Sequence, residues 1–146
     1  MSTKRRNDQQ WAALVSAAFD KLVELGRKNY NETITYSALN NHIAEVTGQS
    51  PFDLHDVYDR HELGLVLGEV NDRAHALVGD KVLITSLLLH KGSDDLGAGF
   101  YGYARRAGLL LPGMDKEQFL IGQEKKVREA LREKGSTATK TALITD

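Results

Sequence analysis

Residues 34–46 read Ile-Thr-Tyr-Ser-Ala-Leu-Asn-Asn-His-Ile-Ala-Glu-Val, and this stretch decides the fold. A hydroxyl side chain opens it, and either Thr35 or Ser37 can cap a helix there. Gly48 follows it and predicts where that helix ends. Three apolar residues recur at the three- and four-residue spacing of a buried helix face: Leu39, Ile43 and Val46.

A longer helix is predicted on the N-terminal side of this stretch. Asn7 and Gln10 have the spacing of a capping box, in which each side chain bonds the other residue's backbone N–H. The helix should run to about Leu25 and end at Gly26. Residues 1–6 ahead of it are polar and basic, and we interpret them as a frayed arm.

Two further helices are predicted on the C-terminal side. Ser50 and Pro51 suit the start of a short helix over about 52–58, and apolar spacing predicts another over about 61–76. Gly64 and Gly68 lie on one face of the second helix, and each costs about 1 kcal/mol relative to Ala. We therefore expect another helix or a strand to pack against these glycines at close range.

The rest of the chain is predicted to hold strands and two more helices. Residues 81–90 are continuously apolar, which indicates a strand covered on both faces or a buried helix segment, and their β-branched start favours the strand. A glycine-rich loop at 97–99, a helix over 100–107 and a second apolar run at 109–111 follow. The last helix should end near Glu133.

This order of elements predicts an α+β fold that is mainly helical, with a winged-helix-like core over about 34–111 and added N- and C-terminal helices. In that core, strands near 81–90 and 109–111 would form the pair that follows the helices. We expect a single globular domain over 1–134 and a flexible tail over 135–146.

Composition excludes several classes of protein. The 146 residues include 19 Lys and Arg against 20 Asp and Glu, which argues against coating nucleic acid by bulk charge but leaves a local basic face open. The chain has no cysteine, so disulfides, zinc ribbons, iron–sulfur clusters and thiol nucleophiles are excluded. The longest apolar run, 82–89, is far shorter than the about 20 residues of a membrane span, and no signal peptide opens the chain. We expect a cytoplasmic protein with no membrane partner and no cofactor.

Parts of the sequence resemble known families. Residues 34–39 resemble the "TYGxLA" helix opening of small bacterial winged-helix modules, including the DNA-binding domain of alkylguanine-DNA alkyltransferases and alkyltransferase-like proteins. Residues 67–70, 84–92 and 97–101 resemble a family of uncharacterised winged-helix-like domains found in phages and beside HNH nucleases. That family has a glycine-bearing helix, an "LSALVV-K-xG" strand and a "PGxGF" loop. Together the resemblance covers about residues 34–108 and implies a DNA-binding fold.

The sequence also departs from these families. Alkyl transfer needs a Pro-Cys-His-Arg segment, and the lack of cysteine excludes that reaction here. The expected recognition helix has Leu65 and Glu69 where the alkyltransferases carry an arginine, and Arg60 alone precedes it. The loop over 95–97 reads Asp-Leu-Gly where the phage family has Pro-Gly.

Four basic residues are the candidates for DNA contact. Arg105 and Arg106 follow two tyrosines, and Lys91 lies in the predicted wing; with Arg60 they form the predicted set of phosphate-binding side chains. Aromatic residues mixed with positive charge are typical of nucleic-acid-binding faces.

A segment rich in histidine and aspartate, residues 53–62, is the candidate for metal or acid–base chemistry. His55 and Asp59 lie four apart, and a distant His42 or His75 would have to complete a metal site. The segment has no HExxH or DxDxDG spacing, and acidic residues near a helix start favour a solvated, salt-bridged helix. We expect no metal and no catalytic residue.

The sequence leaves two main hypotheses for function. The first is a small non-catalytic DNA-binding domain of winged-helix type, which the resemblance favours. The alternative is a protein-interaction module, such as a phage-encoded protein that binds and inhibits a host protein, which the near-neutral charge favours. A hydrolase that uses the His/Asp segment is a third hypothesis, for which the sequence has no catalytic motif.

Overall fold

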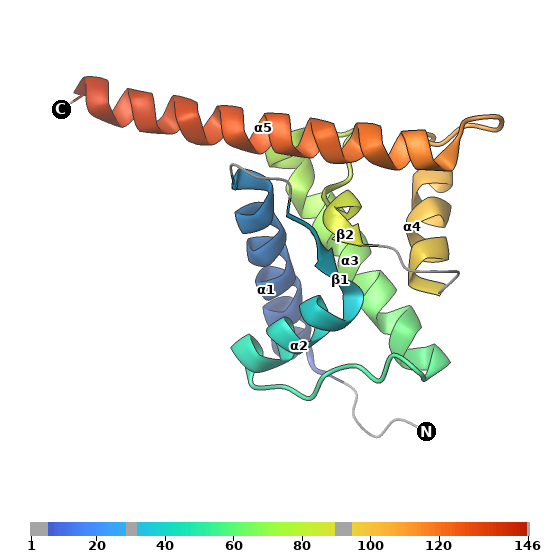
Figure 1. Cartoon of the computed structure of the whole chain (residues 1–146). Coiled ribbons are helices and arrows are strands. Elements are labelled where there is room, and N and C mark those ends of the chain that lie inside the picture. The colour runs from blue at the N-terminus through green and yellow to red at the C-terminus, as the bar shows by residue number, and fades with distance from the viewer. Residues whose placement is uncertain (1–5, 29–31, 90–94, 146) are drawn as a thin grey trace.

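The chain is mainly helical in the computed structural model, which describes residues 6–28, 32–89 and 95–145, with only the backbone described at 89, 95–98 and 133–145 (Figure 1). The elements in chain order are α1 (Asp8–Arg27), β1 (Ile34–Thr35), α2 (Tyr36–Thr47), α3 (Val57–Val78), a short 3-10 helix η1 (Ile84–Leu87), β2 (Leu88–Leu89), α4 (Asp95–Arg106) and α5 (Lys116–Thr145). None of the helices described has the length and apolar character needed to cross a membrane.

The side-chain caps predicted for the first two helices are confirmed. Asn7 Oδ1 accepts from Gln10 N at 2.7 Å and Gln10 Oε1 accepts from Asn7 N at 2.9 Å, so the capping box before α1 is complete. The cap of α2 is Thr35, whose hydroxyl accepts from Ala38 N at 3.1 Å. Gly48 ends α2 with φ at 70°, a left-handed conformation that glycine adopts without steric cost.

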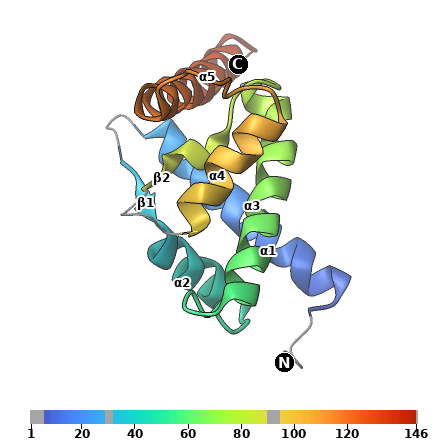
Figure 2. The ribbon, with the colours of Figure 1, turned by 90° about the vertical axis from the view of Figure 1, so that its right-hand side faces the viewer.

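One large core lies between α1, α2, α3, η1 and α5 (Figures 1 and 2). The apolar stripe predicted for α3 is buried in it, whereas Val46 of α2, also expected inside, is 60% exposed. The largest side chains with almost no exposure include Leu14, Leu22, Leu39, Ile43, Leu63, Ile84, Leu87 and Leu131. Burial of this many apolar side chains is the main stabilising contribution to the fold.

Two arginines of α5 bind the end of α1. Arg128 is 3% exposed, and its guanidinium donates to Leu25 O at 3.4 Å and to Glu32 O at 2.6 Å. One turn further on, Arg132 Nε donates to Lys28 O at 2.7 Å. Leu25 lies in the last turn of α1, where its carbonyl also accepts from Lys28 N at 3.3 Å, and Lys28 and Glu32 follow the helix. The two arginines therefore attach α5 to the end of α1 and to the residues after it.

The short helix predicted over 52–58 is wrong for most of that range. The chain has no regular structure there until α3 begins at Val57, with Asp56 as its cap. A buried side-chain amide holds this connection in place of a helix. Asn40 Nδ2 donates to Phe52 O at 2.8 Å, and Asn40 Oδ1 accepts from Phe52 N at 3.0 Å.

The strand predicted over 81–90 is mostly a turn of 3-10 helix. Every residue from 82 to 88 is buried, and a tight helical turn inside the core accounts for the continuous apolar run as well as a central strand would. β2 is two residues long and pairs in parallel with β1, Ile34 with Leu88 and Thr35 with Leu89. Residues 109–111 form no strand, so the strand pair expected for the wing is absent from the described residues.

The last two helices begin or end outside their predicted bounds. α4 begins at Asp95, so residues 97–99 lie in its first turns and do not form a loop ahead of it. α5 remains helical to Thr145, through nearly all of the segment expected as a tail over 135–146. Figure 1 shows this second half of α5 extending beyond the body of the molecule.

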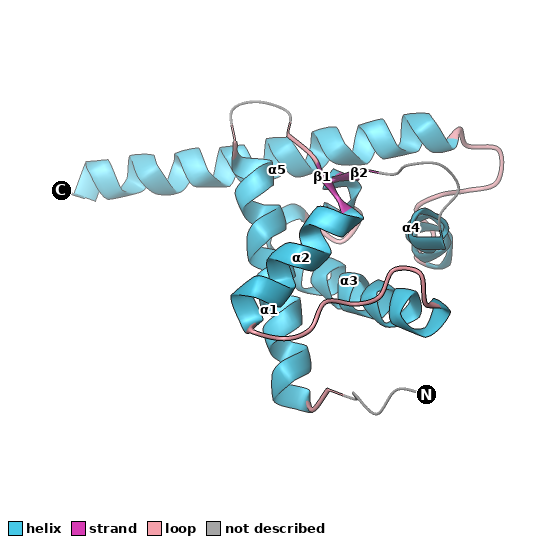
Figure 3. Ribbon diagram, turned by 60° about the horizontal axis from the view of Figure 1, so that its bottom comes forward, coloured by secondary structure: helices cyan, strands magenta, loops and turns pink. Residues whose placement is uncertain are grey.

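A second, smaller core attaches α4. Leu83, Phe100, Ala104 and Leu110 are buried together, and Phe119 of α5 packs against them. Figure 3 shows α4 set apart from α1 and α2, and Figure 2 shows it lying beside α3 below α5. This cluster attaches α4 to α5. Residues of α4 that face α3 line the site described next.

Candidate binding groove between α3 and α4

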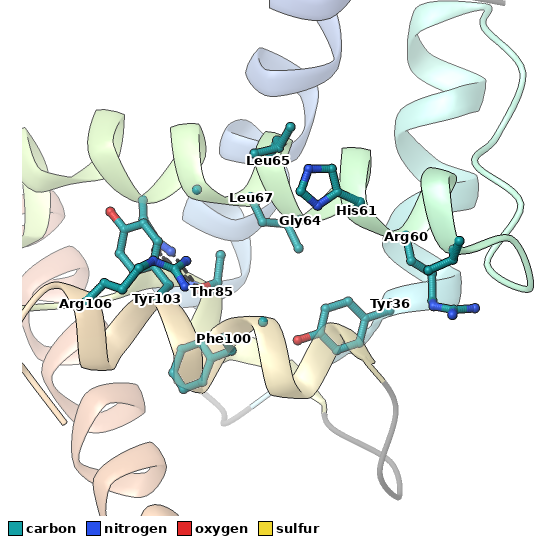
Figure 4. Close-up of a pocket in the computed structure, with 14 residues that line it drawn as sticks. Tyr36, Arg60, His61, Gly64, Leu65, Leu67, Thr85, Phe100, Tyr103 and Arg106 are labelled. Atoms are coloured by element: carbon teal, nitrogen blue, oxygen red, sulfur yellow. Dashed lines mark hydrogen bonds between the residues drawn. The ribbon is translucent and has the colours of Figure 1, made fainter. Parts of the chain in front are cut away.

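A cavity of about 390 Å³ lies between α3 and α4, with the start of α2 at one end (Figure 4). We call it the α3–α4 groove. The lining residues that carry the argument below are Tyr36, Arg60, His61, Gly64, Gly68, Asn71, Thr85, Gly99, Tyr103 and Arg106.

The two glycines of α3 line this groove: Gly64 faces open space, and Gly68 faces the ring of Tyr103 on α4. A Cβ atom placed on Gly64 would meet no other atom within 4 Å. The same atom on Gly68 would meet only the ring of Tyr103, at 3.7 Å, which is an ordinary van der Waals contact. The close packing predicted for both glycines is therefore wrong, and Gly64 leaves bare backbone on one wall. Gly99 of α4 likewise has open space in front of it.

Two arginines line the groove, and one carboxylate, that of Asp72, contacts its wall at the Tyr103 hydroxyl. Arg60 and Arg106 lie toward opposite ends of it in Figure 4, and His61 lies between them on α3. Arg60 is fixed by a hydrogen bond from Nη1 to Leu54 O at 3.0 Å, whereas Arg106 is exposed on the last turn of α4. None of the described residues that line the groove is itself Asp or Glu.

Tyr103 forms a fixed wall near Arg106. Its hydroxyl donates to Asp72 Oδ1 at 2.6 Å, which holds the ring over Gly68. Burial raises the pKa of Tyr103 to about 12, and the hydrogen bond to Asp72 and the charge of that carboxylate add to the rise, while Arg106 opposes it. The phenol is therefore uncharged throughout the physiological pH range.

A buried polar pair lies at the bottom of the groove. Asn71 of α3 and Thr85 of η1 are each 3% exposed. Asn71 Nδ2 donates to Thr85 Oγ1 at 2.9 Å, and Asn71 Oδ1 accepts from Thr85 N at 3.2 Å. A carboxamide has two N–H donors, and this pair uses one of them. The bottom of the groove therefore presents hydrogen-bonding groups in fixed positions.

The structure brings together two of the four predicted DNA-binding residues. Arg60 and Arg106 share the groove, Arg105 is exposed on α4 outside it, and Lys91 lies outside the described residues. Arg6 of the predicted arm is part of the fold, since Nε donates to Gln49 Oε1 at 2.9 Å and the guanidinium lies 4.3 Å from the centre of the Phe52 ring. Sequence reasoning missed Tyr36, His61 and the Asn71–Thr85 pair as groove residues.

The segment rich in histidine and aspartate does not form the expected helix face. His55 precedes α3 and its backbone N–H donates to Asp53 Oδ1 at 3.0 Å, while Asp59 Oδ2 accepts from Asp53 N at 2.6 Å. Within the described ranges, no three His, Asp or Glu side chains lie close enough together to hold a metal ion.

Comparisons with family models, with curated proteins and with solved structures gave no match for this chain.

Proposed function

We propose that the protein is a small non-catalytic DNA-binding domain that contacts nucleic acid along the α3–α4 groove. The observation that supports this most is the lining of that groove, which has Arg60 and Arg106 toward its two ends and no carboxylate among its described residues. Guanidinium groups bind phosphate through paired N–H donors and keep their charge at every physiological pH. Two such groups along one groove suit a ligand with repeated phosphates.

Two acidic residues of α3, Glu69 and Asp72, are engaged in hydrogen bonds within the chain. Glu69 accepts a hydrogen bond from the indole of Trp11 on α1, so its carboxylate is directed toward α1. Asp72 accepts from Tyr103 Oη, which partly satisfies its charge. The net charge of −1 for the whole chain therefore coexists with a groove of positive charge.

The winged-helix-like grouping of residues 34–111 stays a prediction, as do the cytoplasmic location, the single-domain division and the phage context. The proposed binding does not depend on a wing, because the groove is built from α3 and α4 with one residue each from α2 and η1.

The experiment is a fluorescence-anisotropy titration of labelled single-stranded and duplex DNA, at low and at physiological salt. Arg106→Ala should weaken binding about fivefold, as expected for the loss of about 1 kcal/mol from an exposed charge contact. Arg105→Ala is the matched control: it removes the same charge one residue away, outside the groove, and should weaken binding less. Equal effects of the two changes would mean general charge attraction, and no binding at low salt would reject the proposal.

A protein-interaction module remains the second candidate because of exposed apolar side chains on α3, two of which, Val57 and Leu65, line the groove itself. The first half of α3 exposes three large apolar side chains: Val57 at 57%, Tyr58 at 73% and Leu65 at 50%. Exposed apolar side chains that lie together mark protein contact sites more often than isolated ones do. A chain that binds no nucleic acid at low salt would favour this candidate.

A further inference from the structure

We propose that the α3–α4 groove holds a single nucleoside monophosphate unit, with its base between the bare backbone at Gly64 and at Gly99 and its phosphate at Arg106. The inference rests on the proposed function and specifies its ligand as an unpaired nucleotide. The same unit can belong to a single strand or be a free mononucleotide, and the experiment below separates these sources.

The first argument is the energetic cost of Gly64. A glycine inside a helix costs about 1 kcal/mol relative to alanine, and close packing is the usual compensation. Here no atom lies within 4 Å of the position that a Cβ would take, so packing within the chain does not account for this glycine. A ligand that must approach the backbone of α3 does account for it, because any side chain at this position would project into the groove.

The second argument is the size and shape of the groove. Its volume of about 390 Å³ lies near the lower end of the range for small-molecule sites, which is about 300–1,000 Å³. A flat ring suits the space because Gly64 and Gly99 line it from different helices without side chains. A base in a duplex is stacked and paired and cannot enter such a space, whereas an unpaired base can.

The third argument is the set of polar groups at the bottom and at the rim of the groove. At the bottom, Asn71 offers its second amide N–H to the edge of a heterocyclic ring, while the Thr85 hydroxyl is engaged with Asn71 and fixes the amide in place. Figure 4 shows the hydroxyl of Tyr36 also pointing into the groove. At the rim, Arg106 supplies a guanidinium for phosphate, and Tyr103 beside it stays uncharged because its pKa is raised to about 12.

The test fills the groove at Gly64. Gly64→Leu should preserve or raise the melting temperature, since leucine is a better helix former and meets no neighbour there. It should weaken binding of a labelled oligothymidylate by at least about tenfold, a loss of about 1.4 kcal/mol. Gly122→Leu is the matched control, because Gly122 also lies within a helix, α5, with no atom within 4 Å of its Cβ position, and is not in the groove. That control should bind as the wild type does.

Three further ligands separate the possible outcomes: the same strand without bases, the duplex of the same length, and free thymidine monophosphate followed by NMR shifts of the α3 and α4 amides. The inference predicts that the single strand binds more tightly than the baseless strand or the duplex. Equal binding of all three strands, unchanged by Gly64→Leu, would overturn the inference and leave DNA binding in place. Shifts by the free nucleotide with no binding of any strand would support the groove and overturn the proposed function. No binding of strand or nucleotide would overturn both.

Discussion

At the scale of single residues, Tyr103 gives the clearest prediction. Its pKa is raised from 10.0 to about 12, so the folded state prefers the uncharged phenol. The stabilisation is fully present below pH 10 and is lost as the pH rises through about 12, because the unfolded state ionises first. The free energy of unfolding of the wild type should therefore fall more between these two pH values than that of Tyr103→Phe, measured by urea denaturation.

Absorbance titration supplies the direct check on the same residue. The wild type should show a tyrosine that ionises near pH 12, and Tyr103→Phe should lack it. The other titrating groups are common to both proteins and cancel in the comparison. Identical unfolding curves for the two proteins across this range would contradict the proposed contact between Tyr103 and Asp72.

The sequence predicts the chemical character of the candidate residues better than it predicts where they lie in the fold. The sequence predicts four phosphate-binding residues, of which Arg60 and Arg106 line the groove, Arg105 lies outside it and Lys91 lies outside the described residues. Gly64 was noticed for a sound reason, its cost within a helix, but the structure places open space against it where packing was expected. Periodicity shows which face of a helix is unusual and cannot show whether that face meets protein or solvent.

At the scale of elements, the link between α1 and α5 predicts a large effect of a single change. Arg128 is 3% exposed, donates to two carbonyls and forms an ion pair with Glu124 at 3.2 Å. Arg128→Met keeps most of the side-chain volume and removes the guanidinium donors to Leu25 O and Glu32 O. The free energy of unfolding should fall by about 2–4 kcal/mol in urea denaturation.

Lys125→Met is the control on the same helix. Lys125 is exposed, so this change should alter the free energy of unfolding by less than about 0.5 kcal/mol. If the two variants were equally stable, the contact between α5 and the end of α1 would not contribute to stability.

Elements with a local signal could be predicted, and those shaped by the core could not. The caps at Asn7 and Thr35 lie within three residues of the groups they bind, so the sequence contains the whole interaction. Residues 82–88 are all buried, so they are not selected to alternate between apolar and polar. Without that alternation, the sequence does not distinguish a strand from a helix. The connection before α3 is held by the hydrogen bonds between Asn40 and Phe52. These residues are 12 positions apart, and no short-range sequence pattern reveals such a contact.

At the scale of the whole molecule, the proposal predicts a modest dependence of binding on salt. The net charge is −1, so attraction comes from the few cations at the groove and not from the overall field. Two phosphate contacts, at Arg60 and Arg106, give a slope of log K against log salt of about −1.4 for a single strand and about −1.8 for a duplex. Anisotropy titrations at several salt concentrations measure the slope directly. A slope twice as steep would require a larger basic surface than the residues named here provide.

The helical character of the molecule followed from composition and periodicity, but the arrangement of its cores did not. The pairing of β1 with β2 and the separate cluster around Phe100 both depend on contacts between distant segments. The groove exists because α4 belongs to that second cluster, and one sequence without its tertiary contacts cannot reveal such a division.

The long reach of Arg128 also has a consequence for biosynthesis. The carbonyl of Leu25 accepts from Lys28 N nearby and also from Arg128, a residue 103 positions further along the chain. A ribosome adds about 5–20 residues per second, so Arg128 is synthesised at least about 5 seconds after Leu25. During that interval the nascent chain exposes the apolar face that α5 later covers. The main core, to which the fully buried Leu131 belongs, is therefore complete only after translation has passed that residue.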